Sequence, residues 1–174
     1  MLIENLNVVL TGCSRGIGHA ILDLLNQNGA NVFACFRRKN SSTEKKIAEL
    51  TTKYKNEIWP IYFDFENLDE VKAGTKQILS EKKTIHAIIN NAGVILTAPF
   101  LMTSLLEAKR LFDVNFFHQM IFNQALIKNM VRQKSGSVVQ ISSSAAMDGI
   151  EGRAAYASSK AAIESTTKVM AKEF

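Results

Sequence analysis

Two residues that could move a proton stand four positions apart near the end of the chain. Tyr156 and Lys160 enclose three small residues in a stretch that favours a helix, where residues four apart share a face. A phenol with an ordinary pKa of about 10 exchanges protons poorly at pH 7, but a neighbouring ammonium favours the phenolate. The pair therefore predicts acid–base chemistry. An exposed tyrosine and lysine are the alternative, because this spacing is common by chance.

Ser143 lies thirteen residues before Tyr156. It follows Gly136-Ser137-Val138-Val139-Gln140-Ile141, an apolar run that predicts a strand. Strand ends in parallel α/β sheets face the ligand crevice, so a hydroxyl at this position could bind a substrate oxygen. Ser142 and Ser144 are adjacent alternatives, and the residues alone leave the choice open.

A glycine-rich turn must position whatever these residues act on. The apolar run Val8-Val9-Leu10 predicts a buried strand, and Thr11-Gly12-x-x-x-Gly16-x-Gly18 follows it. An apolar-periodic stretch that begins at Ile17 then predicts a helix. Glycines let the backbone approach a pyrophosphate closely, and the helix N-terminus offers free N–H groups. A phosphate-binding loop is therefore favoured over an ordinary turn.

Basic residues follow the second predicted strand, Asn31–Phe36. In dinucleotide-binding folds this position contacts the adenosine ribose, where an acid binds the 2′-hydroxyl of NAD and arginine accepts the 2′-phosphate of NADP. Arg37 and Arg38 occupy it, and no acidic residue occurs between positions 29 and 43. Arg15 is a second candidate for the phosphate. We predict NADP, with a solvated basic loop as the alternative.

The third predicted strand, Ile58–Phe63, leads into Asp64 and Phe65. Asp64 could accept a hydrogen bond from the adenine amino group, with Phe65 beside the ring. It could equally cap the helix predicted over 67–80. The sequence leaves these two interpretations open.

The fourth predicted strand, His86–Ile89, ends in Asn90-Asn91-Ala92-Gly93, where small and amide residues could meet a ligand. The stretch 103–133 is predicted to be mostly helical and contains Asn115. Asparagine is unfavourable inside a helix, so Asn115 invites a functional explanation, although a satisfied or solvent-facing polar residue is the simpler one.

Composition and charge limit the class of protein. The 174 residues are 47% hydrophobic and 21% charged, which is typical of one globular domain with a core. We expect no membrane span, no signal peptide and a cytoplasmic location. Cys13 and Cys35 lack metal-ligand spacing, so we expect reduced thiols and no metal site.

The net charge of +5 suits an anionic partner such as a phosphorylated cofactor, a CoA ester or an acidic carrier protein. Nucleic acid is disfavoured because no basic stripe is interleaved with aromatic residues. Strand and helix alternate five times along the chain. This alternation predicts an α/β protein with a parallel sheet and helices on both faces.

These motifs, taken together and in this order, resemble the short-chain dehydrogenase/reductase family, most closely its 3-oxoacyl-(acyl carrier protein) reductases. The resemblance covers the whole chain. It implies a single, doubly wound Rossmann-type NAD(P)-binding domain over 1–174. It also implies that the helix predicted around Asn115 contributes a catalytic-site asparagine.

The resemblance implies roles for individual residues. The catalytic set would be Ser143, Tyr156, Lys160 and Asn115. Tyr156 would supply the proton, Lys160 would lower its pKa and hold the nicotinamide ribose, and Asn115 would anchor a water chain. The NADP(H) contacts would come from Thr11, Gly12, Ser14, Arg15, Gly16, Ile17, Gly18, Arg37, Arg38, Asp64, Phe65, Asn91, Ala92, Gly93, Tyr156 and Lys160.

The family also implies a substrate and partners. We expect reduction of a 3-oxoacyl thioester, with Lys128, Arg132 and Lys134 meeting an acyl carrier protein or simply complementing a helix C-terminus. A sugar, polyol or steroid substrate and a catalytically silent NADP-binding module are the alternatives. A homodimer or homotetramer is expected. Members usually run to roughly 250 residues, so we expect the C-terminal strands and substrate lid to be missing here.

Overall fold

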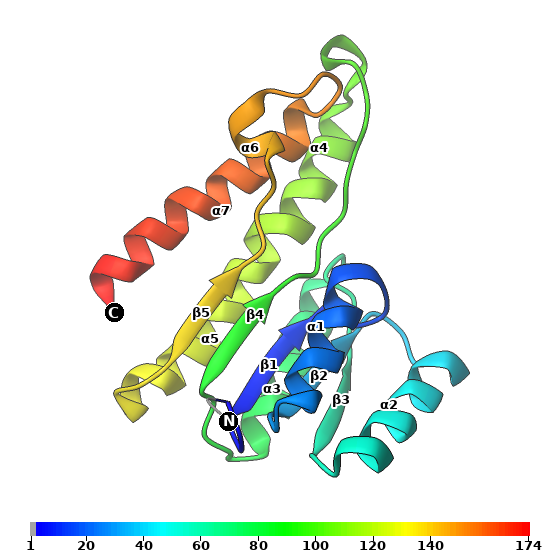
Figure 1. Cartoon of the computed structure of the whole chain (residues 1–174). Helices are drawn as coiled ribbons and strands as arrows, with labels where there is room; N and C mark the ends of the chain where they lie inside the picture. Colours follow the sequence, from blue (N-terminus) through cyan, green and yellow to red (C-terminus); the bar gives the residue numbers. More distant parts are fainter. Residues whose placement is uncertain (1–2) are drawn as a thin grey trace.

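Five parallel strands form one sheet, and the computed structural model describes residues 3–174 (Figure 1). The strands are β1 (Asn7–Thr11), β2 (Asn31–Phe36), β3 (Ile58–Tyr62), β4 (Ala87–Asn90) and β5 (Ser137–Gln140). Their order is β3-β2-β1-β4-β5, and every neighbouring pair is parallel. The order reverses between β1 and β4, which is where such sheets bind ligands. The predicted doubly wound, Rossmann-type sheet is confirmed.

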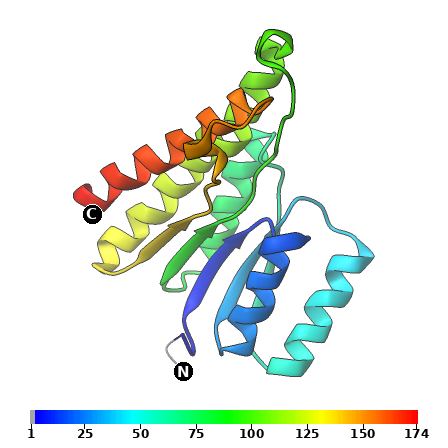
Figure 2. The same ribbon diagram turned by 45° about the horizontal axis from the view of Figure 1, so that its top comes forward.

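Helices cover both faces of this sheet (Figures 1 and 2). They are α1 (Gly16–Gln27), α2 (Ser41–Tyr54), α3 (Leu68–Ser80), α4 (Leu105–Phe112), α5 (His118–Gln133), α6 (Ala145–Asp148) and α7 (Ala154–Glu173). A 3₁₀ turn, η1 (Phe100–Met102), precedes α4, and a π-helical turn, η2 (Asp113–Phe117), joins α4 to α5. Within residues 3–174, none of these helices is both long enough and apolar enough to cross a membrane.

Two hydrophobic cores form because successive strand residues point to opposite faces. Leu10 packs in a cluster with Leu22 of α1 and Leu50 of α2. Val9, its neighbour, packs in a cluster with Phe122 of α5 and the apolar face of α3. Both faces of β1 are therefore buried, which explains its uninterrupted apolar sequence.

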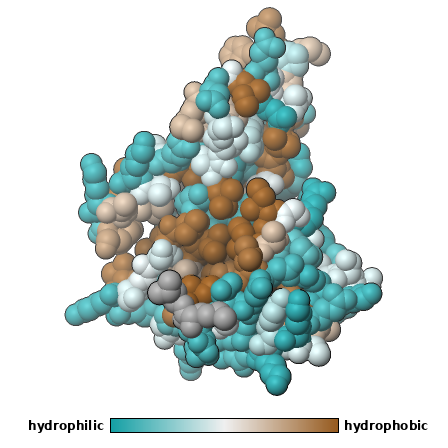
Figure 3. Space-filling model, viewed as in Figure 1, coloured by the Kyte–Doolittle hydropathy of each residue, from teal (hydrophilic) through white to brown (hydrophobic). Residues whose placement is uncertain are grey.

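One part of the sheet remains uncovered. The helices α1 and α2 lie over β1, β2 and β3, and the same face over β4 and β5 shows a hydrophobic surface (Figures 1 and 3). On the edge strand β5, Val139 is 43% exposed and pairs in register with Ile89 of β4. This exposed apolar strip lies beside the carboxyl-terminal edge of the sheet.

Strands β3, β4 and β5 differ by one residue from their predicted bounds, and two helical segments differ further. The sequence predicts a helix over 41–56 with Ser42 or Thr43 as its cap, whereas the N-cap of α2 is Asn40. Asn40 Oδ1 accepts the Thr43 N–H at 2.9 Å, and Thr43 Oγ1 accepts the Asn40 N–H at 3.3 Å. The stretch 103–133 is three helical pieces rather than one, because the π turn interrupts it.

Candidate active site

The glycine loop links β1 to α1 at the point where the strand order reverses. Gly12 and Gly16 have φ of +75° and +57°, a region that side chains disfavour. A Cβ on Gly18 would meet the carbonyl oxygen of Gly12, so only glycine allows this close packing. The α1 N-cap, Arg15, makes no side-chain cap, and the first turn carries no acidic residue. The N–H groups of this turn are therefore available to an anion.

Thr11 and Asn91 lock the glycine loop to the end of β4. Thr11 Oγ1 accepts the backbone N–H groups of Asn91 and Ala92, each at 3.0 Å. The Asn91 side chain donates back to the carbonyl oxygens of Thr11 and Gly12 at 3.1 and 3.2 Å. Thr11 is fully buried. Its side chain thus supports the loop through the backbone of Asn91 and Ala92, whereas the sequence had suggested a direct cofactor contact.

A cavity of about 510 Å³ opens between the glycine loop and the ends of β2, β3 and β4. Nine of the predicted cofactor residues line it: Gly12, Ser14, Arg15, Arg37, Asp64, Phe65, Asn91, Ala92 and Gly93. Six other predicted cofactor residues do not line it. They are Thr11, Gly16, Ile17 and Gly18 of the glycine loop, and the catalytic candidates Tyr156 and Lys160. Arg38 also lies outside the lining but contacts Asp64.

Asn115 is held inside the molecule by the π turn. It is fully buried, and its Oδ1 accepts the Val94 N–H at 2.8 Å. Its Nδ2 donates to the Val94 carbonyl at 2.9 Å and to Ser159 Oγ at 3.1 Å. A π turn is a recurrent feature of functional sites. Here it joins the segment after β4 to α7, and Asn115 is a satisfied buried polar residue rather than a solvent-facing one.

Lys160 lies next to Asn115 across Gly93. A Cβ built on Gly93 would stand 3.2 Å from Asn115 Oδ1 and 3.6 Å from Lys160 Nζ. Lys160 is buried, and its Nζ donates to the Ile141 carbonyl at 2.7 Å. Burial lowers the pKa of this ammonium. The structure therefore brings three predicted site residues, from the segment after β4, from η2 and from α7, to one place.

Tyr156 and Ser143 occupy neighbouring segments at the same end of the sheet. Tyr156 lies in the first turn of α7, one turn before Lys160, and is half-buried. Ser143 is also half-buried, and its Oγ accepts the Ala145 N–H at 3.3 Å. The Ser142 hydroxyl donates to Glu164 Oε1 at 2.6 Å. Ser142 is thus engaged by α7, which leaves Ser143 as the better candidate.

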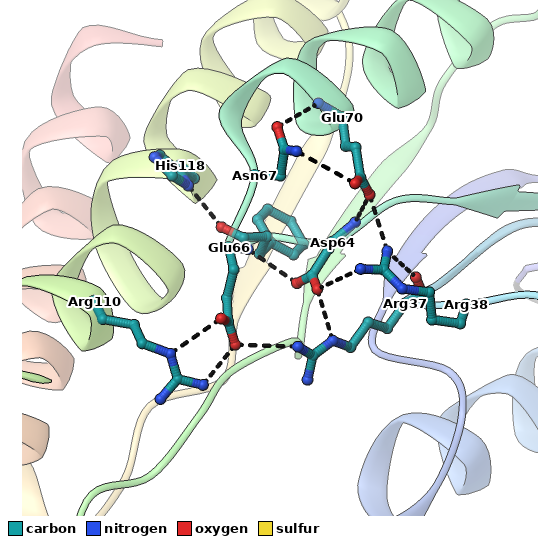
Figure 4. Close-up of polar contacts among 9 residues, drawn as sticks. Arg37, Arg38, Asp64, Glu66, Asn67, Glu70, Arg110 and His118 are labelled. Atoms are coloured by element: carbon teal, nitrogen blue, oxygen red, sulfur yellow. Dashed lines mark hydrogen bonds and ion pairs between the residues drawn. The ribbon is translucent and has the colours of Figure 1, made fainter.

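The basic and acidic residues near the cavity form one alternating chain of ion pairs (Figure 4). We call it the ionic chain, and it runs in the order Arg110, Glu66, Arg37, Asp64, Arg38 and Glu70. Successive shortest N···O distances along it are 2.6, 3.2, 2.8, 3.1 and 3.0 Å. It connects α4 to the first turn of α3 across the end of β2.

The ionic chain affects the pKa of two of its carboxyl groups, those of Asp64 and Glu66. Burial acts to raise the pKa of Asp64, but hydrogen bonds from the Glu66 N–H and Arg37, with the charges of Arg37 and Arg38, lower it overall. Hydrogen bonding from Arg110 lowers the pKa of Glu66. Both carboxylates are therefore ionised at neutral pH. Asp64 does not cap the following helix. Asn67 does so, by accepting the N–H groups of Asp69 and Glu70.

Sequence reasoning missed Glu66 and Glu70, the acidic members of the ionic chain other than Asp64. Glu70 follows Asn67 by three residues, a pattern typical of a helix start, so its place near the cavity could have been inferred. Glu66 and Arg110 are 44 residues apart, and nothing local pairs them. Phe65 lines the cavity, and its ring also packs against the core, 5.7 Å from Phe122 by ring centroids.

The residues present fit a phosphorylated nicotinamide dinucleotide. The glycine loop leaves the first turn of α1 without a side-chain cap or an acidic residue, and the cavity beside it is lined by Arg15 and Arg37. No hydrogen bond or ion pair engages the Arg15 side chain among residues 3–174. Backbone N–H groups and arginine side chains are the donors that phosphates prefer.

Comparison with known proteins agrees with this geometry. A 3-oxoacyl-[acyl-carrier-protein] reductase of Synechocystis sp. is 31% identical over 165 residues, which cover 95% of this chain and 66% of that protein. A 2-dehydro-3-deoxy-D-gluconate 5-dehydrogenase of Formosa agariphila is 30% identical over 169 residues, which cover 95% of this chain and 62% of that protein. The chain thus spans about two thirds of the length of these relatives.

The fold comparison leads to the same family. The crystal structure of a metagenomic short-chain oxidoreductase in complex with NADP superposes with a TM-score of 0.91 and 26% identity, covering 99% of this chain and 78% of that one. The family profile described as short chain dehydrogenase matches residues 6–174. With the parallel sheet, the glycine loop and the clustered Asn115 and Lys160 in place, the chain belongs to the short-chain dehydrogenase family.

Proposed function

We propose that this chain is the dinucleotide-binding and catalytic part of an NADP(H)-dependent oxidoreductase that interconverts a carbonyl and a secondary alcohol. The observation that carries the proposal is the buried ammonium of Lys160, held beside Gly93 and Asn115 and one helical turn after Tyr156. A buried, hydrogen-bonded lysine next to a phenol suits proton transfer better than structural support. Residues 1–174 would form a single domain.

Each residue has a defined task in this proposal. NADPH would supply the hydride for the carbonyl carbon. Tyr156 gives a proton to the carbonyl oxygen, and the Lys160 ammonium favours the phenolate that remains. The Ser143 hydroxyl donates a hydrogen bond to the same oxygen and stabilises the charge that develops there. Asn115 holds the segment that follows Gly93 through both polar groups of Val94, and so keeps the surroundings of Lys160 in place.

Arginine at the end of β2 supports NADP over NAD. Arg37 and Arg38 follow Phe36, where a 2′-phosphate would lie, and Arg15 lines the same cavity as Arg37. The solved relative in complex with NADP supports the same choice. Carboxylates of the ionic chain already pair with Arg37 and Arg38, so a 2′-phosphate would compete with them for these two arginines.

We propose a 3-oxoacyl thioester as the substrate. The support is the name of the Synechocystis relative and the cluster of Lys128, Arg132 and Lys134 near the end of α5, which an acidic carrier protein could meet. The name of the Formosa relative supports a sugar-acid substrate instead. The same basic residues also complement the C-terminus of α5, so they do not decide between the two.

A second copy of the chain is the proposed structural partner, in a homodimer or homotetramer. The two longest helices, α5 and α7, flank a groove of about 540 Å³. Val131 and Val169 in its lining are each 50% exposed. Light scattering tests this assembly, and a mass equal to one chain would exclude it.

NADPH oxidation, followed by absorbance at 340 nm with acetoacetyl-CoA or a keto sugar acid, tests the function. Turnover with the thioester alone supports the acyl proposal, and turnover with the sugar acid alone replaces it. A chain that binds NADPH but turns over neither substrate would favour an NADP-binding module.

A further inference from the structure

The ionic chain neutralises the arginines that are expected to receive a 2′-phosphate. It contains three guanidinium groups and three carboxylates, so its formal charge is zero. Figure 4 shows the carboxylates of Asp64 and Glu70 directed at the two arginines that follow β2. A phosphate that enters this site must therefore compete with carboxylates that are already in place.

Arg38 is the arginine for which a phosphate and the carboxylates would compete most directly. Its Nη1 donates to Glu70 Oε2 at 3.0 Å, and its Nη2 donates to Asp64 Oδ2 at 3.1 Å. Both terminal nitrogens of the guanidinium are thus engaged. A 2′-phosphate that binds both terminal nitrogens of this guanidinium must therefore displace at least one carboxylate.

The displacement is feasible because the pair lies at the surface. The Arg38 side chain is 60% exposed and that of Glu70 is 39% exposed. Ion pairs in such positions contribute little, so a phosphate with a charge of about −1.5 to −2 can replace a single carboxylate. The competition would lower the affinity for phosphate without abolishing it.

We propose that Glu70 is a specificity-determining residue, which competes with the 2′-phosphate of the cofactor for Arg38 and thereby reduces the preference for NADP over NAD. This inference rests on the proposed NADP-dependent function. An adenosine with a free 2′-hydroxyl makes no demand on Arg38. Removal of the Glu70 charge should therefore strengthen binding of a 2′-phosphorylated ligand selectively.

Glu70 can be changed with less damage than Asp64. Asp64 is buried and accepts hydrogen bonds from Arg37, Arg38 and the Glu66 N–H. Glu70 is partly exposed; its Oε2 accepts the Asp64 N–H at 2.9 Å besides Arg38, and its Oε1 accepts the Asn67 side-chain amide at 3.3 Å. Glutamine retains an acceptor for that N–H and removes the charge, so Glu70→Gln isolates the electrostatic effect.

A neighbouring carboxylate provides the matched control. Asp69 has a 93% exposed side chain and pairs with Lys72 at 3.7 Å, away from the ionic chain. Asp69→Asn changes the net charge by the same amount, one residue from Glu70. Isothermal titration would compare two ligands that differ only in the 2′-phosphate, adenosine 2′,5′-bisphosphate and adenosine 5′-monophosphate.

The expected result is a selective gain. Glu70→Gln should bind the bisphosphate about three- to fivefold more tightly than the wild type does, which is the upper part of the range for one exposed ion pair. Its affinity for the monophosphate should stay within about 1.5-fold, and Asp69→Asn should leave both affinities within about 1.5-fold. In an Arg38→Gln background the gain from Glu70→Gln should disappear, because the effect passes through Arg38.

Other results would overturn the inference. Unchanged or weaker bisphosphate binding by Glu70→Gln would mean that Glu70 orients Arg38 for the phosphate. An equal gain in Asp69→Asn, or a gain that persists without Arg38, would reduce the effect to net charge. Thermal unfolding midpoints establish that each variant is folded, and Glu70→Ala gives a second measurement if glutamine lowers the midpoint. A wild type that prefers the monophosphate would instead refute the NADP proposal itself.

Discussion

The Lys160 ammonium donates a 2.7 Å hydrogen bond to the carbonyl oxygen of Ile141, which joins α7 to the segment that follows β5. Ile141 stands two residues before Ser143, and Lys160 stands one turn after Tyr156. Together with the Ser142–Glu164 hydrogen bond, this contact therefore holds the serine segment against the helix that carries the tyrosine. It also keeps a charged group in a buried place.

Burial of Lys160 should make stability depend on pH. The folded state lowers the pKa of this ammonium, whereas an unfolded chain keeps it at about 10.4. Between those two pKa values the unfolded state binds more protons, so the free energy of unfolding rises with pH. The cost of burying the charge is present at lower pH and is relieved as pH rises through the folded pKa.

Urea denaturation between pH 7 and pH 10 measures this effect. The free energy of unfolding of the wild type should rise relative to that of Lys160→Met as pH increases. Lys168→Met removes an exposed lysine from the same helix and should show no such trend. A pH-independent difference between the wild type and Lys160→Met would contradict the prediction.

Asn115→Ala should destabilise the fold. The substitution leaves the N–H and carbonyl of Val94 and the Ser159 hydroxyl without the partner they have now. Unsatisfied buried groups cost about 1–3 kcal/mol each, so we expect a loss of about 2–4 kcal/mol after relaxation. Chemical denaturation measures it. Gln124→Ala, at an exposed position of α5, should change stability by less than about 0.5 kcal/mol, and equal losses in the two variants would refute the assignment.

Tyr156→Phe should abolish most turnover while leaving cofactor binding intact. The loss of the proton donor is expected to lower kcat by about 10²- to 10⁴-fold, because general acid catalysis typically contributes that much. NADPH oxidation with the substrate identified above measures kcat, and titration with NADPH measures binding. Tyr54→Phe removes a hydroxyl from the far end of α2 and should leave kcat unchanged. Unaltered turnover in Tyr156→Phe would show that another group donates the proton.

Two glycines of the cofactor loop should respond differently to alanine. A Cβ on Gly18 would collide with the Gly12 carbonyl and the Asn91 amide, so Gly18→Ala should cost about 3 kcal/mol and weaken NADPH binding strongly. A Cβ on Gly16 meets nothing within 4 Å, and only its φ of +57° opposes the change, at about 1–2 kcal/mol.

Gly149 is the control for that second effect. It also has open space and a positive φ of +61°, but it lies after α6, away from the glycine loop. Gly149→Ala should lower the unfolding free energy about as much as Gly16→Ala does, without changing the Kd for NADPH. If Gly16→Ala and Gly18→Ala both bind NADPH as tightly as the wild type does, the loop does not bind the phosphates.

Local pattern was sufficient for the elements and for most of the cavity lining. The strand β2 runs from Asn31 to Phe36, as its apolar sequence predicts, because a strand buried on both faces must be apolar throughout. Gly12, Arg37, Asp64 and Asn91 were identified because each follows a strand, and parallel strands end at the same edge of the sheet. These are short-range rules that a sequence expresses directly.

Tertiary structure alone decided the partners of the polar side chains. Asn115 faces inward because the π turn shifts it against Val94, and Glu66 meets Arg110 from 44 residues away. Such pairs depend on how whole helices pack onto the sheet, which no local periodicity encodes. The sequence by itself determined a parallel sheet, a glycine loop and a set of reactive residues. Only the packed structure decided that the arginines after β2 would meet carboxylates from the end of β3 and the start of α3.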